Sequence, residues 1–335
     1  MTLTPAQLSI RLAPRVLWQP NSGNSTNVDT VDGFALSFVD KFNAVLINVA
    51  KIKCPGVGLS LILIENDTLN AVATRYDSTG KQYIIGLNKG LFACLQDFFY
   101  NPDVEKTLRT ELSEFAKYDT QTLSRFCCSF SATYILFHEF SHVARGHLEY
   151  MSAHGFEEEE IVEVAADQDT KKDRIRYLIE CDADTRSGRI TAAEVLNQAQ
   201  NIIGQNPRDG AGRLTEDLCV TAAFAIHSTF RVMESTRKAL PRNYPAYDVR
   251  SGIVNTQMIR GIDDVSTRGP AYMKQVDANR SVTKGLQLAE IACAIVSLPR
   301  LSYNAQQYAQ NWIANDAADV DALDAELKKR APCPW

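Results

Sequence analysis

An apolar stretch near the middle of the chain carries the segment His138-Glu139-Phe140-Ser141-His142. Apolar side chains lead into this segment from Cys127 and follow it at Val143 and Ala144, which predicts a buried helix. On a helix, residues four apart lie on one face, so both imidazoles can bind the same ion. Burying two imidazoles and a carboxylate costs free energy unless these groups have partners. The segment therefore predicts a metal site built into a central helix.

A third ligand on the same helix is not expected. The metzincin pattern needs a glycine three residues after His142 and a histidine three residues further on, but the chain has Arg145 and Leu148 there. His147 would lie about 140° around an uninterrupted helix from His142, so we expect it to point elsewhere and to form hydrogen bonds near the helix end. Glu139 is offset around the helix from both histidines, which suits a general base acting on a water molecule at the metal.

A carboxylate from a later helix is the expected third ligand, and two segments have the pattern E-x-x-A-D, one starting at Glu163 and one at Glu180. In this pattern the Glu binds the metal, and the Asp one turn later accepts the free N–H of a ligand histidine. Glu163 follows four consecutive Glu residues, which is typical of a solvated face, whereas Glu180 follows an apolar run. The sequence therefore favours Zn²⁺ held by His138, His142 and Glu180, with Asp184 behind them and Glu163 as the alternative ligand.

Residue patterns predict an α+β fold that is mostly helical. Strands are expected over 57–65, 71–76 and 82–86, with a turn at 77–80, and a long loop over 241–280. Helices are expected over 32–49, 88–99, 103–117, 121–150, 157–170, 172–187, 191–201, 214–239, 281–296 and 303–329. We divide the chain into an N-terminal arm and helix (1–50), a catalytic core (51–240) and a substrate-side loop with C-terminal helices (241–335), packed as one unit.

Composition narrows the possible partners. A net charge of -5 among 335 residues argues against a nucleic-acid partner. The chain has no apolar run of about 18 residues and no signal-peptide pattern at its start, so no membrane contact is expected. The eight cysteines include the adjacent pair Cys127-Cys128, a poor arrangement for disulfides, which indicates reduced thiols and a cytoplasmic location.

Residues from about Leu69 to Gly188 resemble the gluzincin peptidases of the CAAX-prenyl-protease and heat-shock-protease type. The likeness runs through Asn70-Ala71-Val72-Ala73, the segment 86–91, the histidine motif with Gly146-His147, and Glu180-x-x-Ala183-Asp184. The membrane segments of that type are absent here, so the soluble Lit-type phage-exclusion peptidases are a closer comparison. The resemblance implies a zincin-like core with a small sheet packed against the motif helix, and a zinc-dependent endopeptidase that cleaves a protein or peptide substrate.

The resemblance also implies residues that contact the substrate. Asn70 on an edge strand would bind the substrate, and the segment Tyr244–Arg250 corresponds to a histidine and an arginine that serve the oxyanion. Tyr244 replaces the histidine, and its phenol can donate a hydrogen bond equally well. Tyr244 is otherwise an ordinary loop aromatic, and Arg250 is otherwise an ion-pair residue; both alternatives stay open.

Two other functions stay open at this point. One is a catalytically silent regulatory or binding protein on the same scaffold, in which the metal is structural. The other is an enzyme that stays inactive until an activator protein or peptide triggers it. The presence of Glu139 favours catalysis, because a purely structural metal site has no use for a base at that position.

Overall fold

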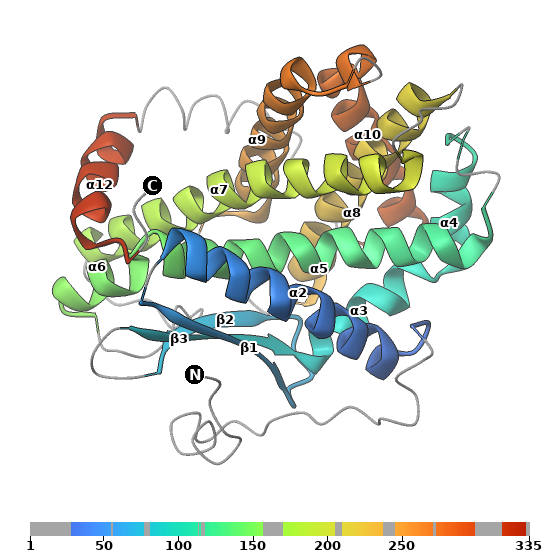
Figure 1. The fold of residues 1–335 in the computed structure, drawn as a ribbon. Coiled ribbons are helices and arrows are strands. Elements are labelled where there is room, and N and C mark those ends of the chain that lie inside the picture. The colour runs from blue at the N-terminus through green and yellow to red at the C-terminus, as the bar shows by residue number, and fades with distance from the viewer. Residues whose placement is uncertain are drawn as a thin grey trace.

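Helices pack on one side of a small sheet in the computed structural model, which describes residues 28–54, 56–76, 81–112, 114, 118–156, 170–204, 210–236, 245–270, 273–298 and 317–332 (Figure 1). The fold is α+β and mostly helical, as the sequence predicts (Figure 1). In chain order the elements are α2 (Val31–Lys53), β1 (Gly58–Ile64), β2 (Ala71–Arg75), β3 (Gln82–Asn88), α3 (Lys89–Phe99), α4 (Pro102–Arg109), α5 (Thr120–Ala144), α6 (His147–Ala153), α7 (Thr170–Ile203), α8 (Ala211–Thr236), α9 (Tyr247–Arg268), the 3₁₀ turn η3 (Met273–Gln275), α10 (Ala278–Ile295) and α12 (Ala317–Arg330).

The sheet has the strand order β1-β3-β2, with β1 parallel and β2 antiparallel to β3. The register pairs Gly58 with Gln82 and Ala71 with Leu87. The three strands begin within a residue of the predicted bounds, while β3 continues to Asn88; the predicted turn at 77–80 lies outside the described residues. Among the described strands, β2 forms one edge of the sheet, and it packs against α5.

Helix α5 forms the centre of the fold. Its first turn is capped by Asp119, whose carboxylate accepts the Thr122 N–H at 2.7 Å. On one side lie the sheet and α2, where Phe42 and Phe137 meet edge to face with ring centroids 6.0 Å apart. On the other side α7 runs alongside α5, with α8 and α9 behind it (Figure 1). Because other elements cover α5 on both sides, the residues that precede the histidine motif on this helix have to be apolar.

Four helix predictions need correction. The helix predicted over 121–150 is divided into α5 and α6, because Gly146 adopts a left-handed backbone with φ +74°. The helix predicted over 103–117 ends at Arg109. The two helices predicted over 172–187 and 191–201 are one continuous helix, α7. Gly188 lies between them without ending the helix. Helix α9 packs so closely against this position that a Cβ would come within 2.7 Å of the Val254 carbonyl oxygen.

The prediction of a long loop over 241–280 is wrong, because most of this segment forms helix α9. Its Gly, Asp and Asn residues indicated an irregular segment, yet its buried side chains follow a helical spacing, among them Val254, Met258 and Ile262. The folding of this segment as a helix places Arg250 in the first turn of α9 rather than on a loop.

The cysteines differ in part from the prediction. Six of them carry free thiols: Cys94, Cys127, Cys128, Cys181, Cys219 and Cys293. Cys54 is disulfide-bonded, so the expectation that all thiols are reduced is wrong for this residue. Spacing along the chain could not reveal this disulfide, because its formation depends on which cysteines the fold brings together.

None of the helices among the described residues is long and apolar enough to cross a bilayer.

Gly146 offers a stability test with a matched control. Gly155 has a similar φ of +72° and open space around it, whereas a Cβ on Gly146 would lie 2.9 Å from Cα of Ala331. We expect Gly155→Ala to cost about 1 kcal/mol of unfolding free energy through backbone strain. Gly146→Ala should cost about 2–4 kcal/mol, because the clash with the chain after α12 adds to the strain. Urea denaturation of both variants measures the difference, and equal losses would contradict the packing described here.

Candidate metal centre

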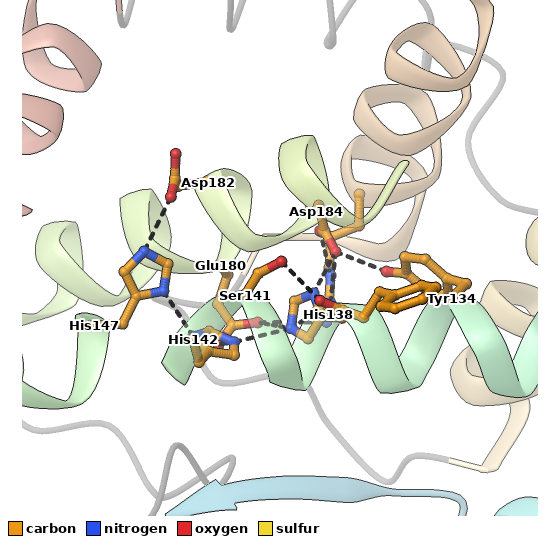
Figure 2. A network of polar contacts seen from close by, with 10 residues as sticks. Tyr134, His138, Ser141, His142, His147, Glu180, Asp182 and Asp184 are labelled. Atoms are coloured by element: carbon orange, nitrogen blue, oxygen red, sulfur yellow. Dashed lines mark hydrogen bonds and ion pairs between the residues drawn. The ribbon is translucent and has the colours of Figure 1, made fainter. Parts of the chain in front are cut away.

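Three buried side chains from two adjacent helices converge on one point. His138 and His142 project from α5 with their Nε2 atoms 3.0 Å apart, and Glu180 reaches them from α7 (Figure 2). Its Oε2 lies 3.3 Å from Nε2 of His138, and its Oε1 lies 3.7 Å from Nε2 of His142. A search of the described residues for His, Cys, Asp and Glu side chains that could hold a metal gives these three. Their donor atoms, one from each residue, lie within 4.8 Å of one another.

The spacing of these atoms suits a tetrahedral zinc ion. With metal–ligand distances of about 2.0–2.1 Å, neighbouring ligands of a tetrahedral ion lie about 3.3 Å apart. The separations of 3.0 Å between the two imidazoles, and of 3.3 and 3.7 Å from them to the two different oxygens of Glu180, lie near that value. Two imidazole nitrogens and one carboxylate oxygen are a donor set typical of zinc, and three protein ligands leave a fourth position open.

Asp184 fixes the orientation of His138. Its Oδ1 lies 2.8 Å from Nδ1 of His138 and accepts a hydrogen bond from the Tyr134 hydroxyl at 2.7 Å. Arg250 donates from Nε to Oδ2 of Asp184 at 2.7 Å. A carboxylate facing Nδ1 keeps the proton of His138 on that atom, which leaves Nε2 available for a metal.

Without a metal, the neighbouring carboxylates favour the protonated form of His138. Burial disfavours its charged form, but Asp184 more than compensates and raises the pKa of His138 to about 9. Burial also opposes the ionisation of Glu180, yet the hydrogen bond from His138 and the neighbouring positive charges hold the pKa of Glu180 below its usual value. The carboxylates of Glu180 and Asp184 thus face Arg250 and an imidazolium. A metal cation binding here would take the place of the proton on Nε2 of His138, while Nδ1 keeps its proton toward Asp184.

Glu139 lies beside this group and is held by the sheet. Its carboxylate accepts a hydrogen bond from the backbone of Ala73 on β2. Burial and the negative charge of Glu180 raise the pKa of Glu139 to about 7, while His138 and Arg250 oppose that shift. A carboxylate with a pKa near neutrality can both take up and release a proton under physiological conditions.

A small cavity of about 30 Å³ opens onto these groups. It has room for one or two water molecules. Besides the three donors and Glu139, its wall includes Asn70, Ala71, Tyr134, Ile135, Met233 and Arg250. The edge strand β2 therefore begins at the cavity.

The structure brings most of the predicted site residues together. His138, Glu139, His142, Glu180, Arg250 and Asn70 line the cavity, and Asp184 lies behind His138. Arg250 forms an ion pair with Asp184, as one of its two alternatives predicts, and it also lines the cavity. Tyr244 and Glu163 lie outside the described residues.

Sequence reasoning missed two residues of the centre. Tyr134 precedes His138 by one helical turn, so the two side chains lie on the same face of α5, and the Tyr134 hydroxyl contacts Asp184. This spacing is the signal from which Tyr134 could have been predicted. His147 was expected to point away, but its Nδ1 lies 2.9 Å from Nδ1 of His142. The expectation assumed an uninterrupted helix, and the break at Gly146 turns His147 back toward His142.

Comparison of the chain with protein-family models, curated proteins and solved structures gave no match. The functional assignment therefore depends on the motif and on the geometry of the candidate metal centre.

Proposed function

We propose that the protein is a zinc-dependent endopeptidase of the gluzincin type. The observation that carries the proposal is the position of Glu139, whose carboxylate lines the same cavity as the three metal donors. A structural zinc site is usually closed by four protein ligands, whereas a catalytic one keeps a position open. Here three donors and a base of raised pKa meet at a cavity large enough for water.

In this proposal Glu139 moves the proton. Bound zinc would supply Lewis-acid activation of water and of the scissile carbonyl. Glu139 accepts the proton of the attacking water on its carboxylate and passes it to the leaving amine. The hydrogen bond from Ala73 holds this carboxylate toward the edge strand, along which the substrate is proposed to bind.

The substrate is proposed to be an extended segment of a protein or peptide. Strand β2 is at the edge of the described sheet, so its outer backbone groups can pair with an added strand. Asn70, at the start of this edge, would bind the substrate backbone beside the cavity. Arg250 and Tyr244 are proposed to donate to the oxyanion.

Regulation is also part of the proposal. The phage-exclusion resemblance favours an enzyme that stays inactive until a substrate or an activator protein binds. Cleavage in expressing cells, without cleavage by the purified protein alone, would indicate such a trigger. The cytoplasmic location is part of this proposal; the six free thiols favour it, whereas the disulfide at Cys54 counts against it.

A search for new protein N-termini tests the proposed activity. Cells that express the wild-type protein should accumulate N-termini that are absent from cells expressing Glu139→Gln at the same level. The comparison works before any substrate has been identified, and each new N-terminus marks a cleavage site directly. Identical sets of N-termini in the two cultures, under conditions that include the proposed trigger, would contradict peptidase activity.

Tyr244 has its own test. If its hydroxyl donates to the oxyanion, Tyr244→Phe should lower turnover by roughly ten- to a thousand-fold with little change in KM. The measurement is the steady-state rate on a cleaved peptide once one has been identified. Unchanged turnover would leave Tyr244 as an ordinary loop aromatic.

A further inference from the structure

A third buried histidine, His147, lies against the metal centre, on the side of His142 that faces away from His138 and Glu180. The rings of His142 and His147 are 5.0 Å apart between centroids, and their Nδ1 atoms are 2.9 Å apart (Figure 2). On its other side, Nε2 of His147 lies 3.0 Å from Oδ2 of Asp182 on α7. Both histidines are fully buried, so water does not compete for these contacts.

We propose that His147 is a positioning residue for the zinc centre, acting by accepting the Nδ1 proton of His142. A neutral imidazole has one donor and one acceptor nitrogen. The Asp182 carboxylate can only accept, so the proton of His147 lies on Nε2 and its Nδ1 is the acceptor. His142 must then carry its own proton on Nδ1. Its Nε2 is left with a free lone pair, directed at His138 and Glu180, as a metal ligand requires.

Asp182 is held in place by two further elements. Arg145, at the end of α5, is buried and donates from Nε to Oδ2 of Asp182 at 2.9 Å. The same guanidinium pairs with Asp324 on the C-terminal helix α12. The acceptor that fixes His147 is therefore tied to α5 and, through Arg145, to α12.

The three carboxylates of the segment Glu180-Cys181-Asp182-Ala183-Asp184 thus have separate tasks. Glu180 faces the two Nε2 atoms. Asp184 contacts Nδ1 of His138 directly. Asp182 reaches His142 through His147, because Asp182 and Asp184 are two positions apart and project from different sides of α7. Each ligand histidine thereby has a carboxylate that determines which nitrogen faces the metal.

Two substitutions of His147 separate positioning from simple packing. This inference rests on the proposed zinc centre but not on peptidase activity, so the readout is zinc affinity, measured by competition with a chelator. His147→Leu removes the acceptor for His142 and should weaken zinc binding roughly 10- to 100-fold. His147→Asn places a carbonyl oxygen near the Nδ1 position and should recover most of the affinity. The control is His154→Leu, because His154 ends the same helix and bonds within that helix, at the Tyr150 carbonyl.

The outcomes are distinct. Wild-type affinity in His147→Leu, or equal losses in the Leu and Asn variants, would overturn the positioning role while leaving the zinc site intact. A wild-type protein that binds no zinc would overturn both proposals. Long-range ¹H–¹⁵N NMR of the zinc-loaded wild-type protein tests the same point without a substitution. His147 should be protonated on Nε2 and His142 on Nδ1, and a proton on Nδ1 of His147 would overturn the inference.

Discussion

Glu180→Ala should cause the largest loss of zinc affinity among substitutions of the carboxylates near the centre, because it removes a ligand from the ion itself. Asp184→Ala should weaken binding by roughly 10- to 100-fold, since Asp184 holds His138 rather than the metal. Glu163→Ala should leave zinc affinity unchanged. Metal analysis of the purified variants and chelator competition give the three values.

The order of these effects tests the choice between the two E-x-x-A-D segments. Glu180 is buried with its oxygens 3.3 and 3.7 Å from the two imidazoles. Asp184→Asn is the matched control for Asp184→Ala, because the amide oxygen can still accept from His138 while the shape is kept. A loss of zinc confined to Glu163→Ala would move the third ligand to the acidic segment and contradict the centre described here.

Glu139→Gln should reduce peptide cleavage by roughly 10²- to 10⁴-fold while zinc stays bound, because the amide keeps the shape of the side chain but cannot take up a proton. The paired measurements are turnover and zinc content of the same preparation. Glu149→Gln is a suitable control, since Glu149 is a partly buried carboxylate on α6 that accepts a hydrogen bond from the Tyr83 hydroxyl and does not line the cavity. Wild-type turnover in Glu139→Gln would show that another group moves the proton.

The motif helix and the sheet could be predicted from the sequence because their signals are local. Apolar runs bounded by turn residues predicted the strands, and the spacing of His138 and His142 predicted a shared face of one helix. The preference for Glu180 over Glu163 came from the apolar residues before Glu180. In the structure Glu180 has an exposed fraction of 2%, and the apolar residues before it pack against α6 and α12.

The remaining features depend on contacts between distant segments. Helix α9 is rich in residues that favour loops, and it is helical because α7 and α8 cover its apolar face. Gly188 stays helical because α9 packs against it, whereas Gly146 ends a helix at a left-handed φ. Local propensity does not distinguish these two glycines, so the position of His147 could not be predicted from spacing.

X-ray absorption at the zinc edge of the purified wild-type protein tests the proposed centre most directly. It reports the metal content and the atoms bound to the metal in one experiment. We expect one zinc per chain with nitrogen and oxygen ligands at about 2.0–2.1 Å, including the signature of two imidazoles. The chain also has eight cysteines, which offer a different kind of site. Zinc bound through sulfur at about 2.3 Å, or a protein that retains no zinc, would contradict a centre formed by His138, His142 and Glu180.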